Sequence, residues 1–329
     1  MKDDLVVVFG GSGFIGKQVV RALAKRGKRV RVAMRRPHLG HELRVMGDVG
    51  QIQLVQANVR FPESVAAALE GATAVVNLVA VMHENGRQTF NALHVEAART
   101  VAEEAAKKGV TRYLHMSALG AGPRGARYAK TKFAGEQAVR EAVRDAVIMR
   151  PSVVFGPGDD FFNRFAAMAQ FASATPLGMM PLIGGGKTKL QPVFVGDVAD
   201  AICAALDRED AQGRTFELGG PRIYTWKEIL SYTMEEADRE VPFLYLPFVI
   251  AQPAGLIANW IFKLLPWDPP LTGDQVTMLT RDNVVGSEAG VGTLADLGVT
   301  SLESVEAIVP SYLWRFRPYG QFQTRQNPT

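Results

Sequence analysis

The chain has 329 residues, of which 47% are hydrophobic and 21% are charged. This composition excludes a largely disordered protein, and the length allows one large α/β domain with a smaller appended region, because single cores rarely grow beyond roughly 250–300 residues. A formal net charge of +4, with local basic stretches at 25–36 and 315–325, favours phosphate groups or anionic lipid over duplex nucleic acid as partners.

Strand and helix patterns alternate over the first 150 residues. The first strand begins by Leu5, which leaves no room before it for a signal or transit peptide, so we expect a cytosolic start. We expect strands at 5–9, 29–34, 52–56, 74–78, 112–116 and 146–149, and helices at 14–26, 62–69, 89–108 and 126–144. This alternation predicts an α/β fold, a Rossmann-type doubly wound parallel sheet with helices on both faces.

Glycines follow the first strand at regular spacing. Gly10, Gly13 and Gly16 give the pattern G-x-x-G-x-x-G between a buried strand and an amphipathic helix. A dinucleotide loop needs glycine at three positions. They are the tight turn, the point where the backbone approaches the pyrophosphate, and the point where the helix packs on the strand. The sequence therefore predicts a dinucleotide site here. The alternative is a glycine turn that binds nothing.

The second strand ends in two arginines, Arg35 and Arg36, where an NAD site would carry an acidic residue. An arginine pair matches a 2′-phosphate, so we expect NADP(H) as the cofactor. The alternative is a solvated loop that happens to be basic. Asn58 after the third strand and residues 77–81 after the fourth, including Val79, occupy places that line the adenine and ribose, although either could simply cap a strand.

A tyrosine and a lysine four residues apart, Tyr128 and Lys132, share one face of the helix expected at 126–144. A nearby ammonium lowers the pKa of a phenol, which would make Tyr128 a usable acid or base in carbonyl chemistry. Ser117, which closes the fifth strand, could hold the substrate oxygen. The alternative is an exposed helical surface.

These motifs, together with RPSVVFGP at 150–157 and VFVGDVA at 193–199, resemble the extended and atypical short-chain dehydrogenase/reductase superfamily over residues 5–220. A closer resemblance rests on DDFFNRF at 159–165, PVFVGDV at 192–198, FELGGP at 216–221 and VPSYLWRFRP at 309–318. These segments resemble the nucleotide-binding accessory subunit of respiratory complex I (NADH:ubiquinone oxidoreductase), in its bacterial form.

The resemblance implies a tightly held NADPH with a structural role and no known substrate. The sequence departs from the catalytic pattern of the superfamily, because a short glycine- and proline-rich loop without a second hydroxyl separates Ser117 from Tyr128, so we expect no turnover. The resemblance also implies other complex I subunits near the quinone-reducing end as partners, and a peripheral location on the cytoplasmic face of the bacterial inner membrane. It places the cofactor contacts on Gly10, Ser12, Gly13, Phe14, Ile15, Arg35, Asn58, Tyr128 and Lys132. The alternative is a soluble NADP-dependent reductase, epimerase or dehydratase that uses Ser117, Tyr128 and Lys132.

Beyond residue 150 the pattern loosens, although a strand at 191–194, a helix at 198–206 and a strand at 215–218 return to the sheet. We expect an NADP(H)-binding domain at 1–220, with segments around 157–190 contributing to a second lobe. The remainder, 221–329, is expected to form a smaller, mostly helical C-terminal lobe with a partner-binding tail. We expect no metal site and no nucleic-acid module.

The C-terminal lobe has an uncharged stretch at 241–262, but three prolines interrupt it and argue against a spanning helix. Residues 257–267, with Trp260 and Trp267, suit a membrane headgroup boundary or a hydrophobic partner groove. A buried helix that closes a substrate pocket is the alternative. The tail at 314–322 interleaves arginine with aromatic residues, which predicts an extended arm that binds a partner subunit, with a loosely ordered tail as the alternative.

Overall fold

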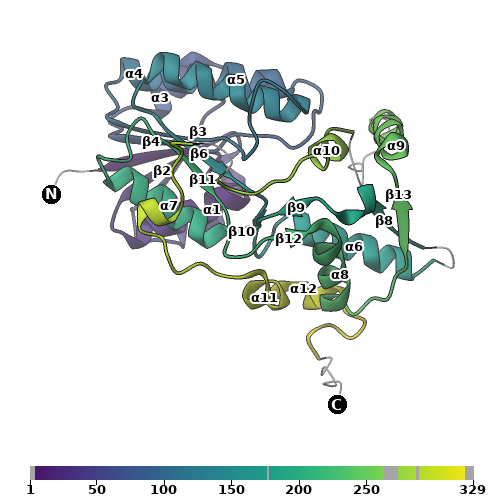
Figure 1. Ribbon diagram of the computed structural model, residues 1–329. Coiled ribbons are helices and arrows are strands. Elements are labelled where there is room, and N and C mark those ends of the chain that lie inside the picture. The colour runs from purple at the N-terminus through teal and green to yellow at the C-terminus, as the bar shows by residue number, and fades with distance from the viewer. Residues whose placement is uncertain (1–3, 176–177, 263–272, 287–288, 323–329) are drawn as a thin grey trace. The chain divides into compact units, whose positions relative to one another are not determined.

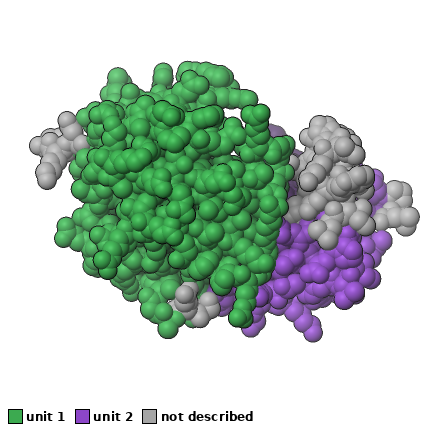
Figure 2. Space-filling model, turned by 90° about the horizontal axis from the view of Figure 1, so that it is seen from above, with its two compact units in different colours: residues 1–152, 195–219, 285–301 green, residues 153–194, 220–284, 302–329 purple. Residues whose placement is uncertain are grey.

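The computed structural model describes residues 4–175, 178–262, 273–286 and 289–322. The chain forms two compact units, which Figure 2 shows in different colours. Unit 1 comprises Met1–Ser152, Val195–Gly219 and Val285–Ser301, and unit 2 comprises Val153–Phe194, Gly220–Val284 and Leu302–Thr329. The chain therefore leaves unit 1 and returns to it twice.

A seven-stranded sheet forms the centre of unit 1. Its strands are β1 (Leu5–Phe9), β2 (Arg29–Met34), β3 (Ile52–Gln56), β4 (Ala74–Asn77), β5 (Arg112–Met116), β6 (Val147–Pro151) and β11 (Thr215–Leu218). Their order is β11-β6-β5-β4-β1-β2-β3, and all neighbouring strands are parallel. The strand order reverses between β1 and β4, which confirms the predicted doubly wound sheet. Ligands of such sheets bind in a crevice outside the carboxyl ends of the strands at this point.

Helices cover both faces of this sheet (Figure 1). They are α1 (Phe14–Lys25) and α7 (Val195–Asp207) on one face, and α3 (Pro62–Ala68), α4 (Ala97–Lys107) and α5 (Arg127–Ala142) on the other. All five residues of β1 are buried, as a strand covered on both faces requires. The helix expected at 89–108 is divided, because Asn91–Glu96 forms π-helical turns before α4 begins.

Unit 2 combines helices with short strand pairs. Its longer helices are α6 (Phe161–Ser173), α8 (Trp226–Glu236) and α9 (Phe248–Phe262). In the part of unit 2 that the structure describes, three strand pairs accompany them: β7 (Val154–Phe155) with β10 (Val193–Phe194), β8 (Met180–Ile183) with β13 (Phe243–Leu246), and β9 (Lys189–Leu190) with β12 (Tyr224–Thr225). An apolar core of its own, which includes Phe162, Trp226 and Leu230, holds the unit together.

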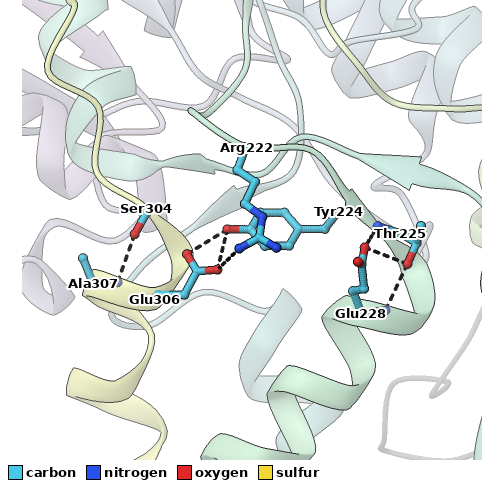
Figure 3. A network of polar contacts seen from close by, with 7 residues as sticks. All are labelled: Arg222, Tyr224, Thr225, Glu228, Ser304, Glu306 and Ala307. Carbon is cyan, nitrogen blue, oxygen red and sulfur yellow. Dashed lines mark hydrogen bonds and ion pairs between the residues drawn. The ribbon is translucent and has the colours of Figure 1, made fainter.

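Polar contacts join the segment after residue 302 to the middle of unit 2. Figure 3 shows that Glu306, on α11 (Val305–Ile308), faces Arg222 and Tyr224. The Tyr224 hydroxyl donates to the Glu306 carboxylate at 2.9 Å, and Nη1 of Arg222 donates to it at 3.0 Å. In the same view, Thr225 and Glu228 form a capping box that starts α8. The C-terminal segment is therefore built into unit 2.

The tail at 314–322 is not fully extended, because it contains short 3₁₀-helical turns at Trp314–Phe316 and Gly320–Phe322 and two of its arginines contact unit 2. Leu313, at the end of α12 (Pro310–Leu313), is fully buried, and Nη2 of Arg315 donates to Oδ1 of Asn163 at 2.6 Å. Arg317 donates to the Glu236 carboxylate at 3.0 Å, and both side chains are largely buried. Trp314, Tyr319 and Phe322 are exposed, so binding of a partner subunit by the tail stays a prediction.

The described residues include no helix that is both long enough and apolar enough to cross a membrane. Helix α9 is 15 residues long and contains Pro253. At its start, Val249 and Ile250 are exposed. The side chain of Trp260, and Trp267 with its neighbours, lie outside the described residues, so the expectations for 257–267 stay predictions.

Candidate functional site

The glycine loop joins β1 to α1 and has the geometry of a phosphate-binding turn. Gly10 has a φ of 80°, and a Cβ there would lie 3.1 Å from the backbone of Leu78. A Cβ on Gly16 would lie 2.2 Å from the carbonyl oxygen of Gly10, so the helix packs on the loop too closely for any side chain. These positions require glycine for conformational and steric reasons.

The start of α1 is open to an anion. Gly13 is its N-cap and contributes no side-chain cap, and the first turn carries no acidic residue. Ser12 and Gly13 are exposed, while Phe14 and Ile15 are half-buried. Free backbone N–H groups and the helix dipole at such an end attract a phosphate. The loop therefore fits the pyrophosphate of a dinucleotide.

A cleft of about 320 Å³ lies at the carboxyl ends of β2 and β3. It is lined by Arg35, Gln56, Ala57, Asn58 and Ser64. Arg35 and Arg36 are both exposed, and no carboxylate lines the cleft. The structure thus places Arg35 and Asn58 in the lining of one cleft, and binding of the adenosine end of a cofactor there stays a prediction.

Asn58 and Val79 both take part in strand-end hydrogen bonds. The Asn58 side chain accepts from the backbone N–H of Arg60 at 3.2 Å. The backbone N–H of Val79 donates to Oδ1 of the buried Asn77 at 3.1 Å. The Asn77 side chain therefore caps the end of β4, and the Asn58 side chain holds the turn after β3. Contact of Asn58 and Val79 with a nucleotide stays a prediction.

Tyr128 and Lys132 lie on one face of α5, as the spacing predicts, and both are buried. The predicted lowering of the phenol pKa is wrong, because burial raises the pKa of Tyr128 to about 12. The ammonium of Lys132 donates to the carbonyl oxygen of Met116 at 2.7 Å, and burial lowers the pKa of Lys132 to about 8. The alternative of an exposed helical surface is also excluded, since Lys132 is only 1% exposed.

Ser117 donates its hydroxyl proton to the carboxylate of Glu136. Arg150, on β6, donates to the same carboxylate through Nε at 2.8 Å and Nη2 at 2.7 Å. All three side chains are at least 90% buried. A buried carboxylate held by a bidentate guanidinium is a structural ion pair, and it engages the proton that Ser117 would otherwise offer to a substrate carbonyl.

His94, in the π-helical turns, packs edge-on against the Tyr128 ring with centroids 5.2 Å apart. Burial, assisted by the Lys132 charge, lowers the pKa of His94 to about 3, so the ring is neutral. The ring of His115, on β5, is fully buried, and burial likewise places its pKa well below the usual range. Gly135 permits this packing, because a Cβ there would meet the backbone oxygen of His94 at 2.1 Å.

Sequence reasoning identified Ser117, Tyr128 and Lys132 but missed Glu136, Arg150 and His94. One signal was available for Glu136, which follows Lys132 by four residues and so continues the same helix face. A second was the charged Arg150 at the end of an apolar strand pattern. Among the described residues, no group of histidine, cysteine and acidic side chains could hold a metal ion.

The family model for the NAD dependent epimerase/dehydratase family matches residues 6–219. Two solved structures similar to this chain share its fold at low sequence identity. DesIV (dTDP-glucose 4,6-dehydratase) from Streptomyces venezuelae, with NAD and TYD bound, has a TM-score of 0.70 at 19% identity and covers 95% of this chain and 96% of its own. The structure of gox2253 has a TM-score of 0.71 at 22% identity and covers 97% of this chain and 100% of its own.

Curated relatives are similar over most of their length. NADH dehydrogenase (ubiquinone) 1 alpha subcomplex subunit 9, mitochondrial, from Arabidopsis thaliana is 36% identical over 298 residues, which cover 87% of this chain and 72% of that protein. Its counterpart from Rattus norvegicus is 32% identical over 314 residues, which cover 92% and 79%. Ceramide reductase from Caulobacter vibrioides is 31% identical over 229 residues, which cover 69% and 68%. The chain therefore belongs to the NAD dependent epimerase/dehydratase family and, within it, to the relatives of the alpha subcomplex subunit 9 of NADH dehydrogenase.

Proposed function

We propose that this chain is an accessory subunit of proton-pumping NADH:ubiquinone oxidoreductase that holds NADPH in a structural role. Relatives from a plant and a mammal, each at least 30% identical over most of the chain, are named as subunits of that complex. The dinucleotide is proposed to bind in unit 1, with the pyrophosphate at Gly10–Gly16. When bound, it would supply a nicotinamide capable of hydride transfer.

The observation that carries the choice of NADPH is the pair of exposed arginines after β2. Arg35 lines the cleft at the carboxyl ends of β2 and β3, Arg36 follows it, and the lining contains no carboxylate. A guanidinium binds a phosphate through two parallel hydrogen bonds, whereas a carboxylate would repel it. A 2′-phosphate therefore fits this cleft better than a bare ribose hydroxyl.

The absence of turnover is proposed from the state of the three candidate catalytic side chains. Ser117 donates to Glu136, Lys132 donates to a backbone carbonyl, and the pKa of Tyr128 is raised to about 12. A general acid or base works best with a pKa near the operating pH. A phenol at about 12 is far from that condition.

The expected location is peripheral, on the cytoplasmic face of the bacterial inner membrane, with other complex I subunits near the quinone-reducing end as partners. Exposed apolar side chains on β13 and the start of α9 support contact of the C-terminal lobe with a membrane surface or a neighbouring subunit. They are Leu244, Tyr245, Val249 and Ile250. Clustered apolar exposure of this kind is typical of interaction surfaces.

Subunit membership can be tested on the source cell. Membranes are solubilised in mild detergent, complexes are separated by size, and the fractions are probed for this chain and for NADH:quinone activity. We expect the chain to migrate with the active complex. Its complete absence from that peak, while it is present as a small free protein, would contradict the proposal.

A second function, a soluble NADP-dependent reductase, epimerase or dehydratase, is favoured by the retained Ser117, Tyr128 and Lys132 and by the similarity to ceramide reductase. It requires Tyr128 to act as the acid or base. The test is NADPH oxidation by purified protein with carbonyl compounds, quinones and nucleotide sugars. Activity that Tyr128→Phe abolishes without loss of NADPH binding would establish this second function.

A further inference from the structure

Residues 80–90, which we call the strap, lead from the end of β4 to the π-helical turns at Asn91–Glu96. The strap reaches the end of β2, because Nη1 of Arg35 donates to Oε1 of Gln88 at 3.1 Å. In the sheet, β1 lies between β4 and β2, and the three strands are parallel. A segment that connects the carboxyl ends of β4 and β2 must pass in front of the end of β1, where the phosphate loop begins.

The strap is also fastened at its base and in its middle. The backbone N–H of Val81 lies 3.2 Å from Nε2 of the buried His94. In the middle, the Glu84 carboxylate accepts from Nη1 of Arg127, at the start of α5, at 2.8 Å. These contacts, with the one at Gln88, tie the strap to three different elements around the crevice.

The tip of the strap holds its own shape. Asn85 and Gln88 exchange backbone hydrogen bonds of 3.2 and 2.9 Å, and the turn between them uses Gly86 at a φ of 53°. The Glu84 carboxylate also accepts from the backbone N–H of Phe90 at 2.8 Å, which closes the segment into a ring. A segment closed in this way moves as a unit, so loss of one anchor affects the whole tip.

We propose that the strap controls release of the nucleotide from unit 1, and that Gln88 is the positioning residue that couples it to a 2′-phosphate through Arg35. This inference rests on the proposed binding of NADPH. A guanidinium has five N–H donors, so Arg35 can keep Gln88 and bind a phosphate at the same time. NADH has no 2′-phosphate, so bound NADH makes no contact with Arg35 that would stabilise the tip of the strap.

The release rate from the full chain is measured by displacing bound NADPH with excess NADP+, which does not fluoresce, and recording the loss of the NADPH fluorescence. We expect Gln88→Ala to release NADPH about fivefold faster than wild type, which is the effect of losing one exposed hydrogen bond to a charged group. The matched control is Gln53→Ala. Gln53 accepts from Nε of Arg31 at 2.8 Å on neighbouring strands, and we expect its loss to leave release unchanged.

A second variant removes the middle anchor. Glu84→Gln abolishes the ion pair with Arg127 but keeps an oxygen that can accept from Phe90, and we expect release to become about threefold faster. Glu141→Gln is its control, because Glu141 forms an exposed ion pair with Arg99 at the same 2.8 Å distance. Both variants change exposed or half-buried side chains, so we expect them to fold.

Hydrogen exchange gives a readout that does not depend on release rates. We expect the amides of residues 82–88 to be better protected with NADPH than with NADH, and Gln88→Ala to remove that difference. A wild-type chain that does not bind NADPH would overturn both the proposed function and the strap. If the wild-type chain binds NADPH and both variants are indistinguishable from their controls, only the proposed role of the strap is overturned.

Discussion

At the scale of single residues, the two ends of the proposed cofactor site differ in kind. Arg35 is exposed and donates to the side-chain amide of Gln88, whereas Lys132 and Glu136 are buried in a network of hydrogen bonds. The first arrangement leaves donors for a ligand. In the second, Ser117 and Arg150 donate to Glu136 and Lys132 donates to a backbone carbonyl, which favours holding a nucleotide over reacting with it.

Substitution of Arg35 tests the choice between the two nicotinamide cofactors. We expect Arg35→Ala to weaken NADPH binding about tenfold or more, because a charge-assisted hydrogen bond contributes roughly 1.5–3 kcal/mol. NADH affinity should not change, since NADH has no 2′-phosphate. Calorimetric titration with both nucleotides measures this, with the exposed Arg21→Ala on α1 as the control. Equal losses for both nucleotides would show that Arg35 does not read the 2′-phosphate.

His94 makes stability depend on pH. Burial lowers its pKa from 6.5 to about 3, so the unfolded chain binds more protons than the folded chain between these values. Stability from His94 is therefore lost as pH falls below 6.5, by about 2 kcal/mol at pH 5. Urea unfolding at pH 7 and pH 5 should show a larger loss for wild type than for His94→Gln. An identical loss in both proteins would mean that His94 is protonated in the folded state.

The sequence predicts that Tyr128 and Lys132 share a helix face, because that depends only on their spacing. It does not predict their protonation behaviour. Burial raises the pKa of Tyr128, and burial lowers the pKa of Lys132 against the opposing effect of the Glu136 carboxylate. Local periodicity carries no information about which strand a helix face will meet.

At the scale of elements, the phosphate loop is where sequence and structure agree most closely. The strand Leu5–Phe9 and the start of the helix at Phe14 match the expected bounds, because an apolar run, a glycine turn and an amphipathic pattern are all local signals. The π-helical turns at Asn91–Glu96 were not predicted. They depend on the close approach of α5 at Gly135, which is a long-range contact.

Substitution of Gly13 tests nucleotide binding independently of the folding of this loop. The φ of −77° at Gly13 suits any residue, and a Cβ would lie 3.3 Å from the Gly10 oxygen, so we expect Gly13→Ala to fold. The added methyl group would face the pyrophosphate, and NADPH and NADH should both bind at least tenfold more weakly. Circular dichroism and calorimetric titration test the two halves of this prediction. Unchanged affinity for both nucleotides would show that the pyrophosphate does not bind at this turn.

At the scale of the whole molecule, the chain returns to each unit at widely separated points. Residues 285–301 belong to unit 1 and residues 302–329 to unit 2. No local sequence pattern predicts that the chain re-enters a unit, because re-entry depends on tertiary contacts such as the pairing of Gly292 with Phe216. The same reason explains why the contacts of Arg315 and Arg317 within unit 2 were not predicted.

The hydroxyl of Tyr312 tests how firmly the C-terminal segment is held. It donates to the buried carboxylate of Asp159 at 2.5 Å, so Tyr312→Phe leaves that carboxylate short of a donor. We expect a loss of about 1–3 kcal/mol in the free energy of unfolding, measured in urea. Tyr319→Phe, at a side chain that is 76% exposed, should have no effect. Equal stability of the two variants would contradict the anchoring role.

The central claim is that the nucleotide is held and does not react. It is tested most directly by purifying the native complex, driving it through many turnovers with NADH and a quinone, and then releasing and identifying the nucleotide bound to this chain. We predict about one NADPH per chain, still reduced, in agreement with a ligand that stabilises the folded state. Bound NAD(H), no bound nucleotide, or NADPH that becomes oxidised during turnover would contradict it.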